Sequence, residues 1–202
     1  MRTACLFALT LPWIASAETI CALGPNAASY NTYSDQRPSA DAMQLAGRVN
    51  AAITPICTPN CPQLPLFRNE TAANTMLVAG TDNAKIVYSP KFFTTVYEAY
   101  GDGAIMMFIA HELGHALDET RPVDWVKRTW APELRADAWA ACILAKSNLN
   151  GRDLGDALTA TARYPSPAHP AWSARLPVLR IGFTQCGGDG AAFDKAASSG
   201  KR

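Results

Sequence analysis

The sequence predicts an α+β domain that is mainly helical and carries a small β-hairpin or sheet. Several segments repeat apolar residues at helical spacing, and two short β-favouring runs flank a turn signal near the middle of the chain. The length of 202 residues suits one domain with a sizeable core. We therefore expect a single domain over residues 18–186.

Composition and charge narrow the classes of partner. Lysine and arginine nearly balance aspartate and glutamate, and the formal net charge is +1. The sequence has no basic run that could follow the phosphates of a nucleic acid. We therefore expect no nucleic-acid partner.

The first residues resemble a secretory signal. Met1 and Arg2 precede an apolar stretch that ends in Ala15-Ser16-Ala17, a cleavage site of the A-x-A type. Residues 1–17 are thus predicted to be removed, and we expect the mature protein to be secreted or periplasmic. A retained membrane anchor is the alternative, but the stretch is short and Pro12 interrupts it. We expect no membrane contact for the mature form.

Cysteine usage agrees with an oxidising compartment. Of the six cysteines, removal of the signal leaves five, for which we expect two disulfides and one free thiol. Cys57 and Cys61 flank a turn-like segment and are close enough to pair locally. Cys142 and Cys186 are the second expected pair, although Cys21 competes equally as a partner.

The N-terminal half combines an arm, a helix and a loop. Residues 18–38 are rich in polar residues and proline without a sustained period, which indicates an irregular arm. Ser39 can cap a helix whose apolar residues recur at helical spacing until Pro55 ends it. The segment 54–65 then carries four prolines and two cysteines, which is typical of a loop held by a disulfide.

The next segments predict a hairpin and two consecutive helices. Residues 76–79 and 84–88 favour strands on either side of the turn signal at 80–83. A helix over 90–100 should close at Gly101, and the helix over 104–119 should be buried because it is apolar on nearly every side.

The C-terminal part is predicted to contain a helix over 132–149, opened by Pro132, and a Pro-rich loop that turns into a further helix after His169. Residues 187–202, rich in Gly, Ala and Ser, are predicted to be a flexible tail. Gly114, inside the helix over 104–119, lowers helix propensity and therefore predicts close approach of a neighbouring backbone.

The pentapeptide His111-Glu112-Leu113-Gly114-His115 carries the strongest chemical signal. Two histidines four apart share one face of a helix, so both imidazoles can bind one Zn²⁺. Glu112, one step around the helix, is positioned to act as general base on a water molecule. The pattern predicts a catalytic zinc site.

A catalytic zinc needs a third protein ligand, and Glu133 is the best candidate. Glu133 and Asp137 share a face of the predicted helix, so Glu133 can bind the metal while Asp137 accepts the far ring N–H of a metal-bound histidine. Asp118 and Glu119 are alternative carboxylates, but a ligand from the same helix would be crowded. His169 could donate to the oxyanion of the transition state, with Arg175 nearby as a fixed charge.

These motifs together resemble the gluzincin zinc metallopeptidases. Most similar are the soluble secreted relatives of the CAAX-prenyl-protease and heat-shock-protease type. The resemblance implies a zincin-like metallopeptidase core with the small hairpin or sheet packed on the HExxH helix. It further implies one Zn²⁺ bound by His111, His115 and Glu133, the base Glu112, Asp137 behind a ligand, and His169 with Arg175 supporting the transition state.

The sequence thus predicts a secreted zinc-dependent endopeptidase that hydrolyses peptide bonds by metal-activated water, with a peptide or protein substrate. Two alternatives are a non-catalytic, zinc-stabilised binding protein on a gluzincin frame and a cell-wall amidase. Glu112 argues against the first alternative, since a purely structural site has no use for it. Substrate preference and oligomeric state are not predicted.

Overall fold

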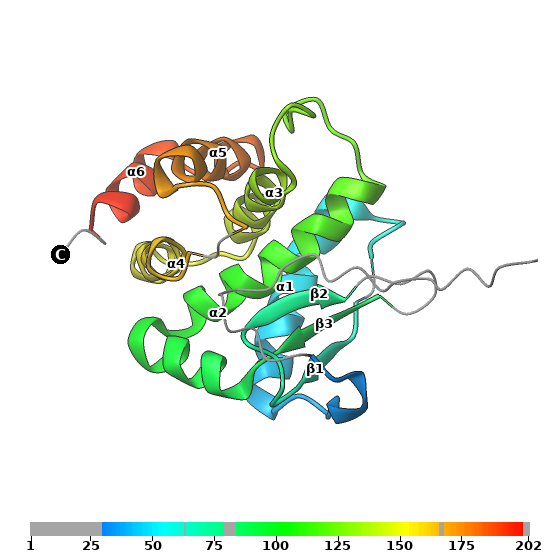
Figure 1. Cartoon of the computed structure of the whole chain (residues 1–202). Helices are drawn as coiled ribbons and strands as arrows, with labels where there is room; N and C mark the ends of the chain where they lie inside the picture. Colours follow the sequence, from blue (N-terminus) through cyan, green and yellow to red (C-terminus); the bar gives the residue numbers. More distant parts are fainter. Residues whose placement is uncertain (1–29, 63, 79–83, 166–167, 200–202) are drawn as a thin grey trace, which may run out of the picture.

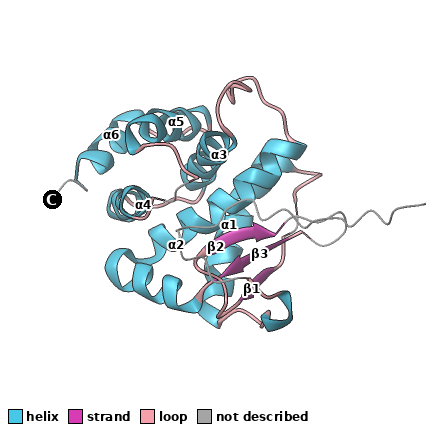
Figure 2. Ribbon diagram, viewed as in Figure 1, coloured by secondary structure: helices cyan, strands magenta, loops and turns pink. Residues whose placement is uncertain are grey.

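A computed structural model describes residues 30–62, 64–78, 84–165 and 168–199. The predicted signal (1–17), most of the predicted arm and Cys21 lie outside the described residues. In chain order, the elements are the 3-10 helix η1 (Thr32–Ser34), α1 (Ala40–Cys57), β1 (Leu66–Arg68), β2 (Thr75–Val78), β3 (Lys85–Tyr88), α2 (Pro90–Thr120), α3 (Pro132–Lys146), α4 (Gly151–Arg163), α5 (Trp172–Gln185) and α6 (Gly190–Ser199). The chain is mainly helical with a small sheet, as predicted (Figures 1 and 2).

The sheet is mixed, with strand order β1-β3-β2. β2 and β3 pair antiparallel, with Leu77 opposite Ile86, so the two strands of the predicted hairpin are confirmed. Residue 79 and the predicted turn at 80–83 lie outside the described residues. β1 pairs parallel to β3 and was not predicted. On one face, Leu77 and Ile86 join the main core with α1 and α2, whereas Met76 and Val87 form a smaller cluster on the other face.

Helix α2 crosses the middle of the molecule, with the sheet on one side and α3 to α6 on the other (Figure 1). Ser39 and Ser89 cap α1 and α2, because each hydroxyl accepts a hydrogen bond from a backbone N–H of the first turn. Gly101, at φ 68°, breaks α2 into two helices, as the sequence predicted. The second of them, which contains residues 104–117, is almost wholly buried.

Three predicted boundaries need correction. The helix predicted over 132–149 ends at Lys146, and Asn148 beyond it has φ 52°, the left-handed conformation common after helix ends. Helix α1 includes Pro55 and ends at Cys57, because the ring disturbs only the preceding turn near the helix end. The predicted flexible tail contains helix α6, which the sequence analysis missed along with α4. Phe193 of α6 is buried against Phe183, with ring centroids 5.4 Å apart, and the helix packs on α4. Tertiary packing therefore orders a segment of loose composition.

Two disulfides join Cys57 to Cys61 and Cys142 to Cys186, with Cα atoms 4.8 and 5.1 Å apart. These are the two pairs expected from the sequence. The second disulfide ties the C-terminal part of α3 to the residue that caps α5. Among the described helices, none combines the length and apolar character needed to cross a bilayer.

Candidate metal centre

The second half of α2 supplies His111, Glu112 and His115. All three are buried, although each is polar, and the two imidazole rings lie with centroids 5.0 Å apart. Buried polar groups of this kind need partners or a ligand to offset the loss of water. The partners come from α3, β2 and the segment before α5.

Helix α3 brings Glu133 to the two histidines. Glu133 Oε2 lies 3.1 Å from His111 Nε2 and 3.7 Å from His115 Nε2. The predicted close approach at Gly114 makes this placement possible: a Cβ there would lie 2.6 Å from the Ala136 carbonyl oxygen. The absence of a side chain at position 114 therefore lets α3 lie directly against α2.

His111, His115 and Glu133 form a buried group that could hold a metal ion, with ligand atoms all within 4.8 Å of one another. A tetrahedral zinc keeps neighbouring ligand atoms about 3.4 Å apart, close to the 3.1 and 3.7 Å between Glu133 Oε2 and the two imidazole nitrogens. His115 Nε2 is buried and has no hydrogen-bond partner among the described residues. An orphaned imidazole nitrogen aimed at two other donor atoms is the arrangement expected of a metal ligand.

Asp137 fixes the orientation of His111 from behind. Its Oδ1 lies 3.0 Å from His111 Nδ1 and 2.7 Å from Arg175 Nη2, and its Oδ2 accepts from Arg175 Nε at 2.7 Å. Burial alone would raise the pKa of Asp137, but the hydrogen bonds from Arg175 and His111 outweigh it and lower the pKa. An ionised carboxylate only accepts, so His111 carries its proton on Nδ1 and presents Nε2 to the cluster.

The remaining groups are held in the protonation states that metal binding requires. Burial, reinforced by the neighbouring His111, lowers the pKa of His115 to about 3. Burial opposes ionisation of Glu133, yet the adjoining imidazoles of His111, His169 and His115 lower its pKa well below the usual value. Neutral imidazoles and an ionised carboxylate are the forms that ligate metals.

His169 lies inside the cluster. Its Nε2 is 2.8 Å from Glu133 Oε2 and 3.2 Å from His111 Nε2, and burial lowers its pKa despite the hydrogen bond to Glu133. Arg175 is also present, but its guanidinium is bound to Asp137, and its Nη1 lies 3.4 Å from the Thr161 carbonyl oxygen. Arg175 therefore contacts the carboxylate behind His111, and it also lines the cavity beside the cluster.

Glu112 is held by the sheet. Its Oε2 accepts a hydrogen bond of 2.7 Å from the backbone N–H of Leu77 on β2, which sets the direction of the carboxylate. The alternative carboxylate Asp118 is instead bound to Arg135, whose Nε donates to it at 2.7 Å, and so stands apart from the cluster.

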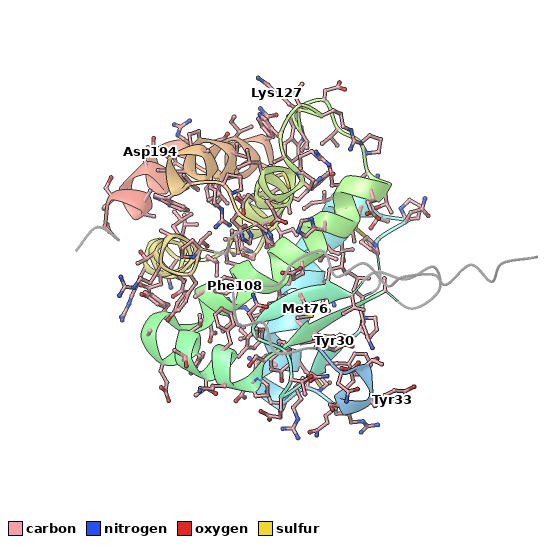
Figure 3. All side chains as sticks on the ribbon, viewed as in Figure 1. Tyr30, Tyr33, Met76, Phe108, Lys127 and Asp194 are labelled. Carbon is pink, nitrogen blue, oxygen red and sulfur yellow. A yellow bond between two sulfur atoms is a disulfide. The ribbon has the colours of Figure 1, made fainter. Side chains whose placement is uncertain are left out.

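A small cavity adjoins the cluster between α2, α4 and β2. Its volume is about 10 Å³, which is room for about one water molecule. It is lined by Thr75, Met107, Phe108, His111, Glu112, Thr161, Tyr164, His169 and Arg175. In Figure 3, the label Phe108 marks the α2 side of this cavity, and the label Met76 marks the sheet, to which Thr75 belongs. Sequence reasoning missed the lining residues from β2 and α4, because no motif marks them.

The structure brings together the seven residues that the sequence favoured for the site: His111, Glu112, His115, Glu133, Asp137, His169 and Arg175. No known family matches the chain, and neither curated proteins nor solved structures gave a match. The functional assignment therefore depends on the geometry of the site itself.

Proposed function

We propose that this chain is a secreted or periplasmic zinc-dependent endopeptidase with a gluzincin-type site. The observation that carries the proposal is the convergence of His111 Nε2, His115 Nε2 and Glu133 Oε2 beside a buried glutamate. Two imidazoles and one carboxylate form a donor set typical of catalytic zinc. The two disulfides support an oxidising compartment.

In this proposal His111, His115 and Glu133 hold the zinc, which when bound would polarise a substrate carbonyl and acidify a water molecule. The Glu112 carboxylate is the proposed general base, which would accept a proton from the attacking water and return it to the leaving amine. The Leu77 N–H holds Glu112 Oε2, so the base is oriented before substrate arrives.

Asp137 keeps the proton on His111 Nδ1, and Arg175 in turn keeps Asp137 ionised. His169, through Nε2, is the proposed donor to the oxyanion that develops on the scissile carbonyl. Because His169 Nε2 also lies within ligand range of the cluster, metal content has to be measured together with activity.

The test measures zinc by elemental analysis and peptide hydrolysis in the wild type, Glu112→Gln and Glu133→Ala. We expect the wild type and Glu112→Gln each to bind one zinc, but only the wild type to hydrolyse peptide. Glu133→Ala should lose the zinc. Hydrolysis should also stop when a chelator removes the metal. Full activity of Glu112→Gln, or full zinc retention in Glu133→Ala, would contradict the proposal.

The substrate arm of the same test compares unstructured protein with cell-wall peptide. We expect cleavage of the unstructured protein at internal peptide bonds. Cleavage of the cell-wall peptide alone would instead favour an amidase, and zinc without any hydrolysis would favour a binding protein.

A further inference from the structure

Thr75 presents a buried hydroxyl next to the candidate catalytic groups. The residue begins β2 and is 1% exposed, and its Oγ1 has no hydrogen-bond partner among the described residues. A buried hydroxyl without a partner is costly and uncommon in folded proteins. Since Thr75 lines the cavity beside His111 and Glu112, its missing partner is expected to occupy that cavity.

The cavity is too small for most side chains. Its volume of about 10 Å³ admits about one water-sized group. Met107, Phe108 and Tyr164 form its wall. Met107 is 1% exposed and packs in the main core, while Phe108 and Tyr164 each contact Phe92 edge-on, with ring centroids 5.2 and 5.5 Å apart. Close packing makes such a wall hard to displace.

We infer that this cavity is a specificity subsite that accepts a small side chain with a hydrogen-bonding group, serine above all, from a residue flanking the scissile bond. The inference rests on the proposed peptidase function and adds the substrate class. A serine Oγ would take the place of the one water that fits and would hydrogen-bond the hydroxyl of Thr75, which lines the cavity. Alanine and glycine fit the space but leave Thr75 unpaired, and larger side chains meet the wall.

A matched control lies in the same cavity. Thr161 also lines it and is 2% exposed, but its Oγ1 donates to the Ala157 carbonyl oxygen of its own helix at 2.8 Å. The two threonines therefore share their surroundings and differ in whether the hydroxyl is already bonded. Replacing Thr161 by valine should leave substrate choice unchanged.

The experiment profiles cleavage sites in a peptide library by mass spectrometry, using the zinc-loaded wild type, Thr75→Val, Thr75→Ser and Thr161→Val. We expect wild type to favour serine over alanine by about three- to tenfold at one flanking position, the contribution of one hydrogen bond. Thr75→Val should lose this preference and still reject large side chains. Thr75→Ser and Thr161→Val should keep it.

The outcomes separate this inference from the proposed function. Chelator-sensitive cleavage with large side chains at both flanking positions would overturn the subsite, as would an unchanged serine preference in Thr75→Val. If the wild type with measured zinc cleaves no peptide, the proposed function fails and the subsite fails with it. Should Thr75→Val not fold, Thr75→Ala removes the same hydroxyl, and the wild-type profile alone still decides the size restriction.

Discussion

The contact at Gly114 predicts that adding one methyl group will weaken metal binding. A Cβ at position 114 would lie 2.6 Å from the Ala136 carbonyl oxygen, whereas ordinary contact begins at 3.4 Å. Helices α2 and α3 must therefore separate by about 0.8 Å in Gly114→Ala. Metal sites tolerate errors of only about 0.2 Å in ligand distance, so Glu133 would no longer complete the site made by His111 and His115.

We expect Gly114→Ala to lower zinc affinity by about 10- to 100-fold, as loss of ligand positioning commonly does. Overpacking destabilises by about 1–3 kcal/mol, and the better helix propensity of alanine returns about 1 kcal/mol. The unfolding free energy of the metal-free protein should therefore fall by up to about 2 kcal/mol. Competition with a chromophoric chelator measures the affinity, and urea unfolding of chelator-treated protein measures the stability.

Gly47 provides the control for helix propensity alone. It lies exposed in α1, and an added Cβ would meet nothing within 4 Å. Gly47→Ala should stabilise the protein by up to about 1 kcal/mol and leave zinc affinity unchanged. If Gly114→Ala bound zinc as tightly as the wild type, the argument that this contact places Glu133 would be refuted.

Three further predictions concern stability. Asp137→Asn should destabilise by about 3–5 kcal/mol, because Arg175 keeps its buried charge without a carboxylate; an unfolding midpoint equal to wild type would contradict this. In the metal-free protein, the pKa of His115 is about 3 when folded and 6.5 when unfolded. Between these pH values the unfolded state binds more protons than the folded state. The free energy of unfolding should therefore fall as the pH drops, by up to about 1.4 kcal/mol per pH unit. Urea titrations from pH 7 to 4 should show that slope. Removing the Cys142–Cys186 disulfide with a double serine substitution should lower the free energy of unfolding by about 4 kcal/mol, because the disulfide closes a loop between cysteines 44 residues apart. Calorimetry measures this change, and a decrease under about 1 kcal/mol would contradict the loop-entropy explanation.

Local signals in the sequence predicted the elements that depend on local chemistry. Ser39 and Ser89 mark two helix starts, and Gly101 marks the break in α2, because capping and positive φ need particular residue types nearby. Helix α4 was missed although its signal was present. Asn150 caps it, and Leu154, Ala157, Leu158 and Thr161 follow at helical spacing.

Other elements depend on contacts that no local pattern contains. Strand β1 has three residues, and each pairs with a residue of β3 that lies 20 positions further along the chain. Helix α6 has only one large apolar residue, Phe193, and its order comes from packing of Phe193 and Ala196. Longer-range tertiary contacts decide both.

The site divides in the same way. His111, Glu112 and His115 form a motif whose spacing alone indicates the chemistry. Glu133 and Asp137 could also be predicted from their spacing, which puts both on one face of a second helix. Thr75 and Tyr164 carry no motif. Only the structure identifies them as part of the site, because it places β2 and α4 beside the histidines.

The Cys142–Cys186 disulfide has a consequence for how the metal centre is assembled. It joins the far end of the helix that carries Glu133 and Asp137 to the end of the helix that carries Arg175. Formation of the disulfide therefore lowers the conformational entropy that the chain loses when these groups come together. Metal binding then has less of this entropy loss to offset. Since coupling between two events acts equally in both directions, zinc bound at the site should make this disulfide harder to reduce.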